Sequence, residues 1–401
     1  MTSNFHRIIF ARPRILTVVI LLGGLGGGAI FLFRQPSPSL AEYASRMITR
    51  CNKAERLQEC YDREIPTLMD HLSMEETFAV TRIILSQSPS YGYCHVLGHK
   101  LSARETRKDL DRWKEVISRC PTDVCNYGCL HGPLLERFGT QYISEEALEE
   151  VKKELADVCK PRANWNPTQL ERSMCYHGMG HLHMYLTRAD VPKSTELCQY
   201  LARENDPRYF PICLEGVFMQ IFQPLEPEDE ALIAHIAPTK ETVEAFCNGF
   251  SGIVRDWCWR ESLPLFRGDI ATPEGLLSFC SFPATPEGKS SCLISAINTV
   301  ATTYLITEED PTKLKRYCEA LPQEIVDECF SISAQRLIQT SASYVTKATD
   351  FCKSLREEHR RKCYESIAGL GTKIAEPHSE DLKRFCDNLP SPWNVSCAFS
   401  P

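Results

Sequence analysis

Residues 318–329 read CEALPQEIVDEC, two cysteines that enclose ten residues and a proline. Ten residues stretched out would span about 35 Å, whereas the Cα atoms of a disulfide lie about 6 Å apart. A disulfide here would therefore force the enclosed chain to double back. Apolar residues recur three and four positions apart around the cysteines, as in an amphipathic helix. The stretch predicts two short helices joined by a turn that a disulfide fastens.

Eighteen of the 20 cysteines of the 401-residue chain fall into such successive pairs, which enclose eight to fifteen residues, and Cys94 and Cys125 are left as a plausible tenth pair. Their even number, their density and the absence of a Cys-x-x-Cys motif favour disulfides over zinc knuckles or a thioredoxin-type redox pair. Buried free thiols in a cytosolic protein are the alternative. The expected pairs are Cys51/Cys60, Cys94/Cys125, Cys120/Cys129, Cys159/Cys175, Cys198/Cys213, Cys247/Cys258, Cys280/Cys292, Cys318/Cys329, Cys352/Cys363 and Cys386/Cys397.

Regular spacing of the cysteine pairs indicates a repeated structural unit. We expect an all-α fold of disulfide-stapled helical hairpins, in which the first helix ends near one cysteine and the second begins near the next. Stacked hairpins would form an α-solenoid, which grows by contacts between neighbouring units. In period and hairpin design this architecture is similar to that of tetratricopeptide-like α-solenoids, although their consensus residues are absent.

The N-terminal segment Ile15–Phe33 is uncharged and long enough to cross a bilayer as a helix. We expect residues 1–14 to be a cytoplasmic N-terminus, 15–33 a transmembrane anchor and 34–41 a linker, because disulfides require an oxidising, exoplasmic space for the rest. A cleaved signal peptide is the alternative. Beyond the linker, residues 42–230 are interpreted as histidine-rich helical repeats and 231–401 as cysteine-paired helical repeats.

Histidines cluster after cysteines in the N-terminal half, and His95/His99 and His177/His181 each lie four residues apart. Residues four apart share one face of a helix, which suits two imidazole ligands on one metal ion. His131 and Glu215, both two positions after a cysteine, are the expected further donors. His183 would point away and is a weaker candidate.

Zinc, copper and iron would each accept such ligands. A non-covalent haem is a further candidate, whereas covalent attachment is excluded because no Cys-x-x-Cys-His is present. In the competing structural interpretation, each histidine next to a glycine simply bonds a backbone carbonyl at a tight helix crossing. Established catalytic motifs are absent from the sequence, although Glu136, Glu215 or Glu261 would be candidate bases for a metal-dependent reaction.

Three segments carry a resemblance to a group of proteins: Cys94-His-x-x-Gly-His99, Cys175-Tyr-His-Gly-x-Gly-His181 and Cys213-Leu-Glu-Gly-Val-Phe-Met219. They resemble elements of uncharacterised exported bacterial proteins with repeated Cys/His/Gly helices, a resemblance that implies no known activity. The net charge of −7, with interspersed acids and bases, argues against a nucleic-acid partner.

Two functional hypotheses follow from the sequence. The first is a membrane-anchored exoplasmic scaffold or accessory subunit that binds protein partners in a membrane complex and carries a histidine-lined metal or haem site. The second is a metal-dependent exoplasmic enzyme that uses His95, His99, His131, His177 and His181.

Overall fold

The computed structural model describes residues 38–88, 91, 94–121, 124–139, 144–340, 344–374 and 379–399. These residues form helices and no strand, which confirms the all-α prediction. The predicted anchor at residues 15–33 lies outside the described residues. Among those described, none of the helices combines the length and apolar character that a bilayer crossing needs. The residues from Leu40 onward form one compact unit.

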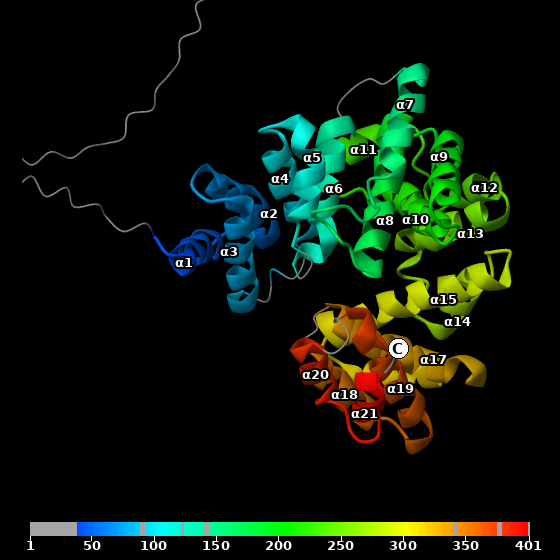
Figure 1. Ribbon diagram of the computed structural model, residues 1–401. Helices are drawn as coiled ribbons and strands as arrows, with labels where there is room; N and C mark the ends of the chain where they lie inside the picture. The colour runs from blue at the N-terminus through cyan, green and yellow to red at the C-terminus, as the bar shows by residue number, and fades with distance from the viewer. Residues whose placement is uncertain are drawn as a thin grey trace, which may run out of the picture. The chain divides into compact units, whose positions relative to one another are not determined.

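The N-terminal half of this unit contains α-helices joined by short 3₁₀ and π segments (Figure 1). In chain order they are α1 (Leu40–Cys51), α2 (Leu57–Glu64), η1 (Ile65–Asp70), α3 (Met74–Gln87), α4 (His95–Thr106), η2 (Leu110–Arg112), α5 (Trp113–Ser118), η3 (Cys125–Tyr127), α6 (Gly128–Leu134), η4 (Leu135–Gly139), α7 (Glu145–Ala156), α8 (Gln169–Leu186), α9 (Val191–Glu204), α10 (Tyr209–Phe222) and α11 (Pro227–Ile233). The first helix begins inside the predicted linker, because Ala44 and Met47 already bury an apolar face.

The C-terminal half continues the same alternation of helices (Figure 1). It comprises α12 (Val243–Asn248), α13 (Gly252–Glu261), η5 (Leu263–Phe266), α14 (Pro273–Phe279), α15 (Pro286–Ala301), η6 (Thr302–Thr307), α16 (Pro311–Glu319), α17 (Gln323–Thr340), α18 (Val345–Lys353), α19 (Glu357–Ile374), α20 (Glu380–Cys386) and α21 (Trp393–Phe399).

One helix of each hairpin packs against its counterpart in the next hairpin. The contacts run in sequence order from α4 to α6, α8, α10, α13, α15, α17, α19 and α21. A repeated unit that contacts its neighbours in this way is a helical repeat architecture.

Capping residues in the sequence determine where several of the helices begin. The tetrapeptide Thr-Pro-Glu-Gly occurs at residues 272–275 and 285–288, and in both copies the threonine hydroxyl accepts a hydrogen bond from the glycine amide. Proline in the first turn loses no hydrogen bond there. Thr168 and Glu171 form a capping box at the start of α8, which fixes where this histidine-bearing helix begins.

All ten predicted disulfides are present, and no free cysteine remains among the described residues. The bridges join the cysteines as the sequence predicted: Cys51 to Cys60, Cys94 to Cys125, Cys120 to Cys129, Cys159 to Cys175, Cys198 to Cys213, Cys247 to Cys258, Cys280 to Cys292, Cys318 to Cys329, Cys352 to Cys363, and Cys386 to Cys397. The alternative of buried free thiols is therefore wrong for these residues.

In most hairpins the position of the second cysteine corrects the prediction that the second helix begins near it, although Cys129 is the second residue of α6 and agrees with the prediction. In the corrected hairpins that cysteine lies well inside the second helix, as the following residues show: Cys60 in α2, Cys258 in α13, Cys329 in α17 and Cys363 in α19. The capping and first-turn residues lie within the enclosed loop, so the helix starts before the bridge is reached. The turn between the two helices is consequently shorter than the loop that the disulfide closes.

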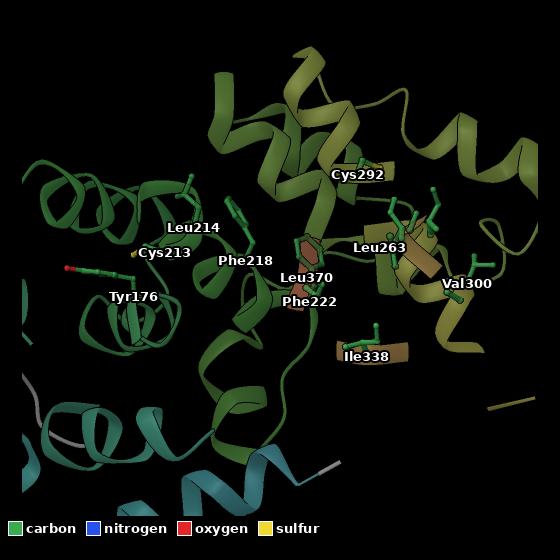
Figure 2. Packing of buried hydrophobic residues seen from close by; sticks show 14 of the residues in the cluster. Tyr176, Cys213, Leu214, Phe218, Phe222, Leu263, Cys292, Val300, Ile338 and Leu370 are labelled. Atoms are coloured by element: carbon green, nitrogen blue, oxygen red, sulfur yellow. The ribbon is translucent and has the colours of Figure 1, made fainter. Parts of the chain in front are cut away.

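Buried side chains form a cluster that runs from α5 to α21. Figure 2 shows part of it, with Leu214, Phe218 and Phe222 of α10 in the same cluster as Val300 of α15 and Ile338 of α17. Bridged cysteines such as Cys213 and Cys292 belong to the cluster as well. The short bridges, which separate their cysteines by 9 to 16 residues, each add on the order of 2–3 kcal/mol of stability.

Candidate metal centre

Glycines allow the histidine-bearing helices to approach each other closely. A methyl group at Gly132 of α6 would overlap the carbonyl oxygen of His99 in α4, and one at Gly216 of α10 would overlap that of His177 in α8. Only glycine permits such backbone contact. Gly132 therefore lets the helix of His131 approach that of His95 and His99, and Gly216 lets the helix of Gln220 approach that of His177 and His181.

Three imidazole nitrogens converge in the space between α4 and α6. The His99 Nε2 atom lies 3.0 Å from His95 Nε2 and 3.2 Å from His131 Nδ1. One nitrogen from each of the three rings lies within 4.8 Å of the others, and all three residues are buried. His95 and His99 thus share one helix face, as their spacing predicted, and His131 joins them from the next hairpin.

The outward nitrogens of two of these rings are held by backbone carbonyls. His95 Nδ1 lies 3.0 Å from the carbonyl oxygen of Asn126, and His131 Nε2 lies 3.1 Å from that of Met174. A carbonyl only accepts, so each outward nitrogen must carry the proton and donate it. The inward nitrogens, His95 Nε2 and His131 Nδ1, consequently present lone pairs toward His99.

A turn of unusual backbone conformation places one of these carbonyls. Cys125, Asn126 and Tyr127 have φ angles of 58°, 46° and 61°, the left-handed region that non-glycine residues seldom adopt. Such positions each cost on the order of 1–3 kcal/mol and persist where the surroundings hold them. Here the disulfide between Cys94 and Cys125 joins the turn to the residue before His95.

The third ring is polarised by a carboxylate. Among the described residues His99 Nδ1 has no hydrogen-bond partner, but it lies 3.6 Å from Glu226 Oε2 at the start of α11. A carboxylate on this side favours the proton on Nδ1 and leaves the Nε2 lone pair facing the other two rings.

The second predicted pair, His177 and His181 of α8, lies next to this group. Their Nε2 atoms are 3.1 Å apart, and the His131 ring centroid is 5.7 Å from each of theirs. His131 packs directly over Gly178, where a methyl group would lie 3.0 Å from His131 Nε2 and closer still to its Cδ2. His181 Nδ1 contacts the Gln220 Oε1 atom at 2.6 Å.

Burial favours the neutral form of the His95, His131, His177 and His181 imidazoles. It lowers the pKa of His95, His131 and His177 well below the usual 6.5, and neighbouring histidine charge lowers the pKa further. Burial also lowers the pKa of His181 to about 4. Neutral imidazoles retain the lone pair that a metal ion requires.

The remaining predicted residues lie elsewhere. Glu215 is not part of the three-nitrogen group, because its carboxylate oxygens lie 3.4 Å from the Arg260 guanidinium. Glu136 forms an ion pair with Arg107, and Glu261 is buried beside Arg260.

His183 sits 3.6 Å from both sulfurs of Cys198 and Cys213. These three residues form a second potential ligand group by distance. The two sulfurs are joined in a disulfide, however, and a metal ligand must be a thiolate. Burial also lowers the pKa of His183 to about 3, consistent with a packed, neutral ring.

Sequence reasoning missed the groups that orient the rings. The carbonyls of Asn126 and Met174, and the side chains of Glu226, Gln220 and Asp229, carry no motif that would distinguish them. Comparison with protein-family models, curated proteins and solved structures found no match to this chain.

Proposed function

We propose that the protein binds a transition-metal ion through His95 Nε2, His99 Nε2 and His131 Nδ1. One observation carries the proposal. Two of these nitrogens are lone-pair acceptors because their outward partners are carbonyls, and both face His99 Nε2, which holds at most one proton. Hydrogen bonding can satisfy only one of the two contacts fully, whereas a cation satisfies all three lone pairs.

The distances support direct coordination. Metal–imidazole bonds of about 2.0–2.1 Å place two nitrogens on one ion roughly 2.8–3.4 Å apart for bond angles between a right angle and a tetrahedral one. The observed 3.0 and 3.2 Å fall in this range. Axial ligands of a haem stand on opposite faces of the macrocycle, so contacts this short favour a bare ion. Imidazole ligands suit zinc, copper and iron.

A metal titration tests the proposal. The full chain, purified without reductant and stripped with a chelator, is titrated with Zn²⁺ in competition with a chromophoric chelator. We expect the His99→Ala variant to bind at least about 100-fold more weakly, because it removes the nitrogen shared by both short contacts. The exposed His71, changed to alanine, serves as the matched control and should leave the affinity unchanged.

Two results would count against this function. One is a wild-type chain that takes up no more Zn²⁺ than the buffer blank. The other is a His99→Ala chain, correctly folded by circular dichroism, that binds Zn²⁺ with the same affinity as the wild type.

A bound ion should also raise the melting temperature, since ligand at 100 times its dissociation constant adds about 2.7 kcal/mol to the free energy of unfolding.

The setting of this site is also proposed. We suggest an exoplasmic α-solenoid, anchored by residues 15–33, whose hairpins from α12 onward provide a surface for protein partners in a membrane complex. Ten disulfides support an oxidising compartment, and successive helix contacts support the solenoid. Alkaline extraction of membranes should retain the full chain and release a variant that lacks residues 1–34. A full-length chain found in the soluble fraction would contradict the anchor.

A metal-dependent enzyme is the second candidate. Three histidine ligands with an open fourth position are the ligand count of catalytic zinc in several hydrolases, and the present group has three. Catalytic turnover that requires the metal and disappears in His99→Ala would support this candidate. Full metal loading without turnover across a panel of ester, amide and phosphate substrates would leave binding as the function.

A further inference from the structure

The pair His177/His181 lies beside the proposed three-histidine site but outside its ligand group. We propose that this pair binds a second transition-metal ion, so that the five histidines form a two-metal centre. The inference rests on the proposed function, because it places the second ion next to the first.

The pair has the geometry of two ligands on one ion. His177 Nε2 and His181 Nε2 are 3.1 Å apart, almost the same distance as the 3.0 Å between the corresponding atoms of His95 and His99. Both pairs are spaced four residues apart on one helix, so the same helical geometry produces both contacts. The two ring centroids are 4.9 Å apart at an interplanar angle of 69°, compared with 4.6 Å and 64° in the first pair.

A chain of buried polar groups fixes the proton of His181. Gln220 Nε2 donates to Asp229 Oδ1 at 2.6 Å, so the amide oxygen of Gln220 is the atom that faces His181 Nδ1. That oxygen only accepts, hence His181 must carry its proton on Nδ1 and present its lone pair from Nε2. Such outer partners orient metal-bound histidines and raise their basicity.

The end of this chain is itself held firmly. Asp229 Oδ1 also accepts from the Tyr185 hydroxyl at 2.6 Å, and Asp229 Oδ2 accepts from the backbone amides of Leu225 and Glu226, each at 3.1 Å. Glu226 is the residue whose carboxylate faces His99 in the first site. The start of α11 therefore supports both ligand sets.

His177 is the unsatisfied member of the pair. Its Nδ1 atom is buried and has no hydrogen-bond partner among the described residues. Its Nε2 atom faces the His181 lone pair. Since no described group fixes the proton on either nitrogen, the ring can carry it on Nδ1, and its Nε2 lone pair then faces the same point as the lone pair of His181.

Distances favour two ions over one shared ion. With bonds of about 2.0–2.1 Å, one ion holds ligand nitrogens no more than about 4.2 Å apart. One ring nitrogen from each of His95, His99 and His131 lies within 4.8 Å of the other two, and neither His177 nor His181 belongs to this group. The His131 centroid is 5.7 Å from both His177 and His181, against 5.1 and 5.2 Å from the first pair. Two-metal sites in enzymes place their ions about 3.5–4 Å apart.

Counting bound ions tests this inference. The stripped full chain is loaded with Cu²⁺, freed of excess ion by gel filtration, and analysed by mass spectrometry for copper per chain and by electron paramagnetic resonance. We expect two Cu²⁺ per chain with a spin-coupled signal. The His177→Ala/His181→Ala variant should retain one, with an uncoupled signal. A control that replaces the exposed His71 and His235 with alanine should still bind two.

Gln220→Leu provides a second variant that keeps every ligand. It removes the acceptor for His181 Nδ1, and loss of such an outer partner lowers metal affinity about 10–100-fold. The loss should affect the second ion and spare the first, even if the double alanine variant does not fold.

Each other outcome overturns the two-metal centre. One ion per wild-type chain leaves the proposed function intact and rules out the second site. So do two ions that both persist, uncoupled, in the double variant, or a Gln220→Leu chain whose second affinity is unchanged. A wild-type chain that binds no ion overturns the proposed function together with this inference.

Discussion

The contact between Gly178 and His131 offers the sharpest test of the proposed centre. Substitution of Gly178 by alanine adds one methyl group on α8, 3.0 Å from His131 Nε2 and nearer to His131 Cδ2. Carbon atoms in ordinary contact lie about 3.5–4.0 Å apart. The imidazole must therefore move by about 1 Å, which takes His131 Nδ1 away from His99 and Nε2 away from the Met174 carbonyl.

The magnitude follows from two opposing effects on the free energy of unfolding. Alanine in a helix interior is favoured over glycine by about 0.5–1 kcal/mol. Overpacking in a buried site costs about 1–3 kcal/mol, and His131 is 1% exposed. We expect Gly178→Ala to destabilise the fold by up to about 2.5 kcal/mol. Metal affinity should fall by at least about 10-fold, the usual effect of a disturbed ligand.

A matched control isolates the steric contact. Gly369 lies on exposed α19 surface, where an added methyl group meets no atom within 4 Å. Gly369→Ala should therefore show only the helix-propensity gain and unchanged metal binding. In a His131→Ala background the clash is absent, so Gly178→Ala should become stabilising. The coupling between the two substitutions should be about 1–3 kcal/mol in urea unfolding.

The reasoning fails if Gly178→Ala matches Gly369→Ala in both stability and Zn²⁺ affinity. It also fails if the destabilisation persists unchanged once the His131 ring is removed. Either result would mean that the His131 position does not depend on the glycine.

Two further predictions concern stability. Burial raises the pKa of Glu261 to about 8, so the folded chain holds a proton that the unfolded chain releases, and the free energy of unfolding falls as pH rises from about 4.5 to 8. The Glu261→Gln variant should therefore match the wild type near pH 4.5 and be more stable at pH 8, by on the order of 3 kcal/mol in urea unfolding. An equal dependence of stability on pH in both chains would refute this. Alanine at both Cys94 and Cys125 should lower the free energy of unfolding by about 3.5 kcal/mol and weaken Zn²⁺ binding. Alanine at both Cys386 and Cys397 should lower it by about 3 kcal/mol and leave Zn²⁺ binding intact. Equal Zn²⁺ affinities in the two variants would refute the link between the Cys94–Cys125 disulfide and the metal site.

The sequence was sufficient to predict the helical class and the nine disulfides between nearby cysteines, whereas Cys94–Cys125, 31 residues apart, was inferred as the pair that remained. Short cysteine spacings leave few partners within reach, and the helical pattern around them defines the hairpins. It was also sufficient for the His95/His99 and His177/His181 pairs, because two residues four apart on a helix share a face whatever the tertiary structure.

The rest depended on tertiary geometry. Glu215 was expected beside the histidines because it follows Cys213 as His177 follows Cys175, yet Arg260 from the next hairpin engages its carboxylate. The carbonyl of Asn126 became a partner through three consecutive left-handed residues, none of them glycine. No local pattern marks such a turn, since it is held by its surroundings and opposed by its own residues.

Bridged cysteines stand beside the ligands, with Cys94 next to His95 and Cys129 two residues before His131. A nascent chain with reduced thiols would therefore lack the scaffolding that aims these imidazoles at one point. We expect the proposed metal site of such a reduced chain to bind Zn²⁺ poorly. Disulfide formation would then have to precede metal binding at the proposed site, and thiol reductants in a purification buffer would weaken that binding.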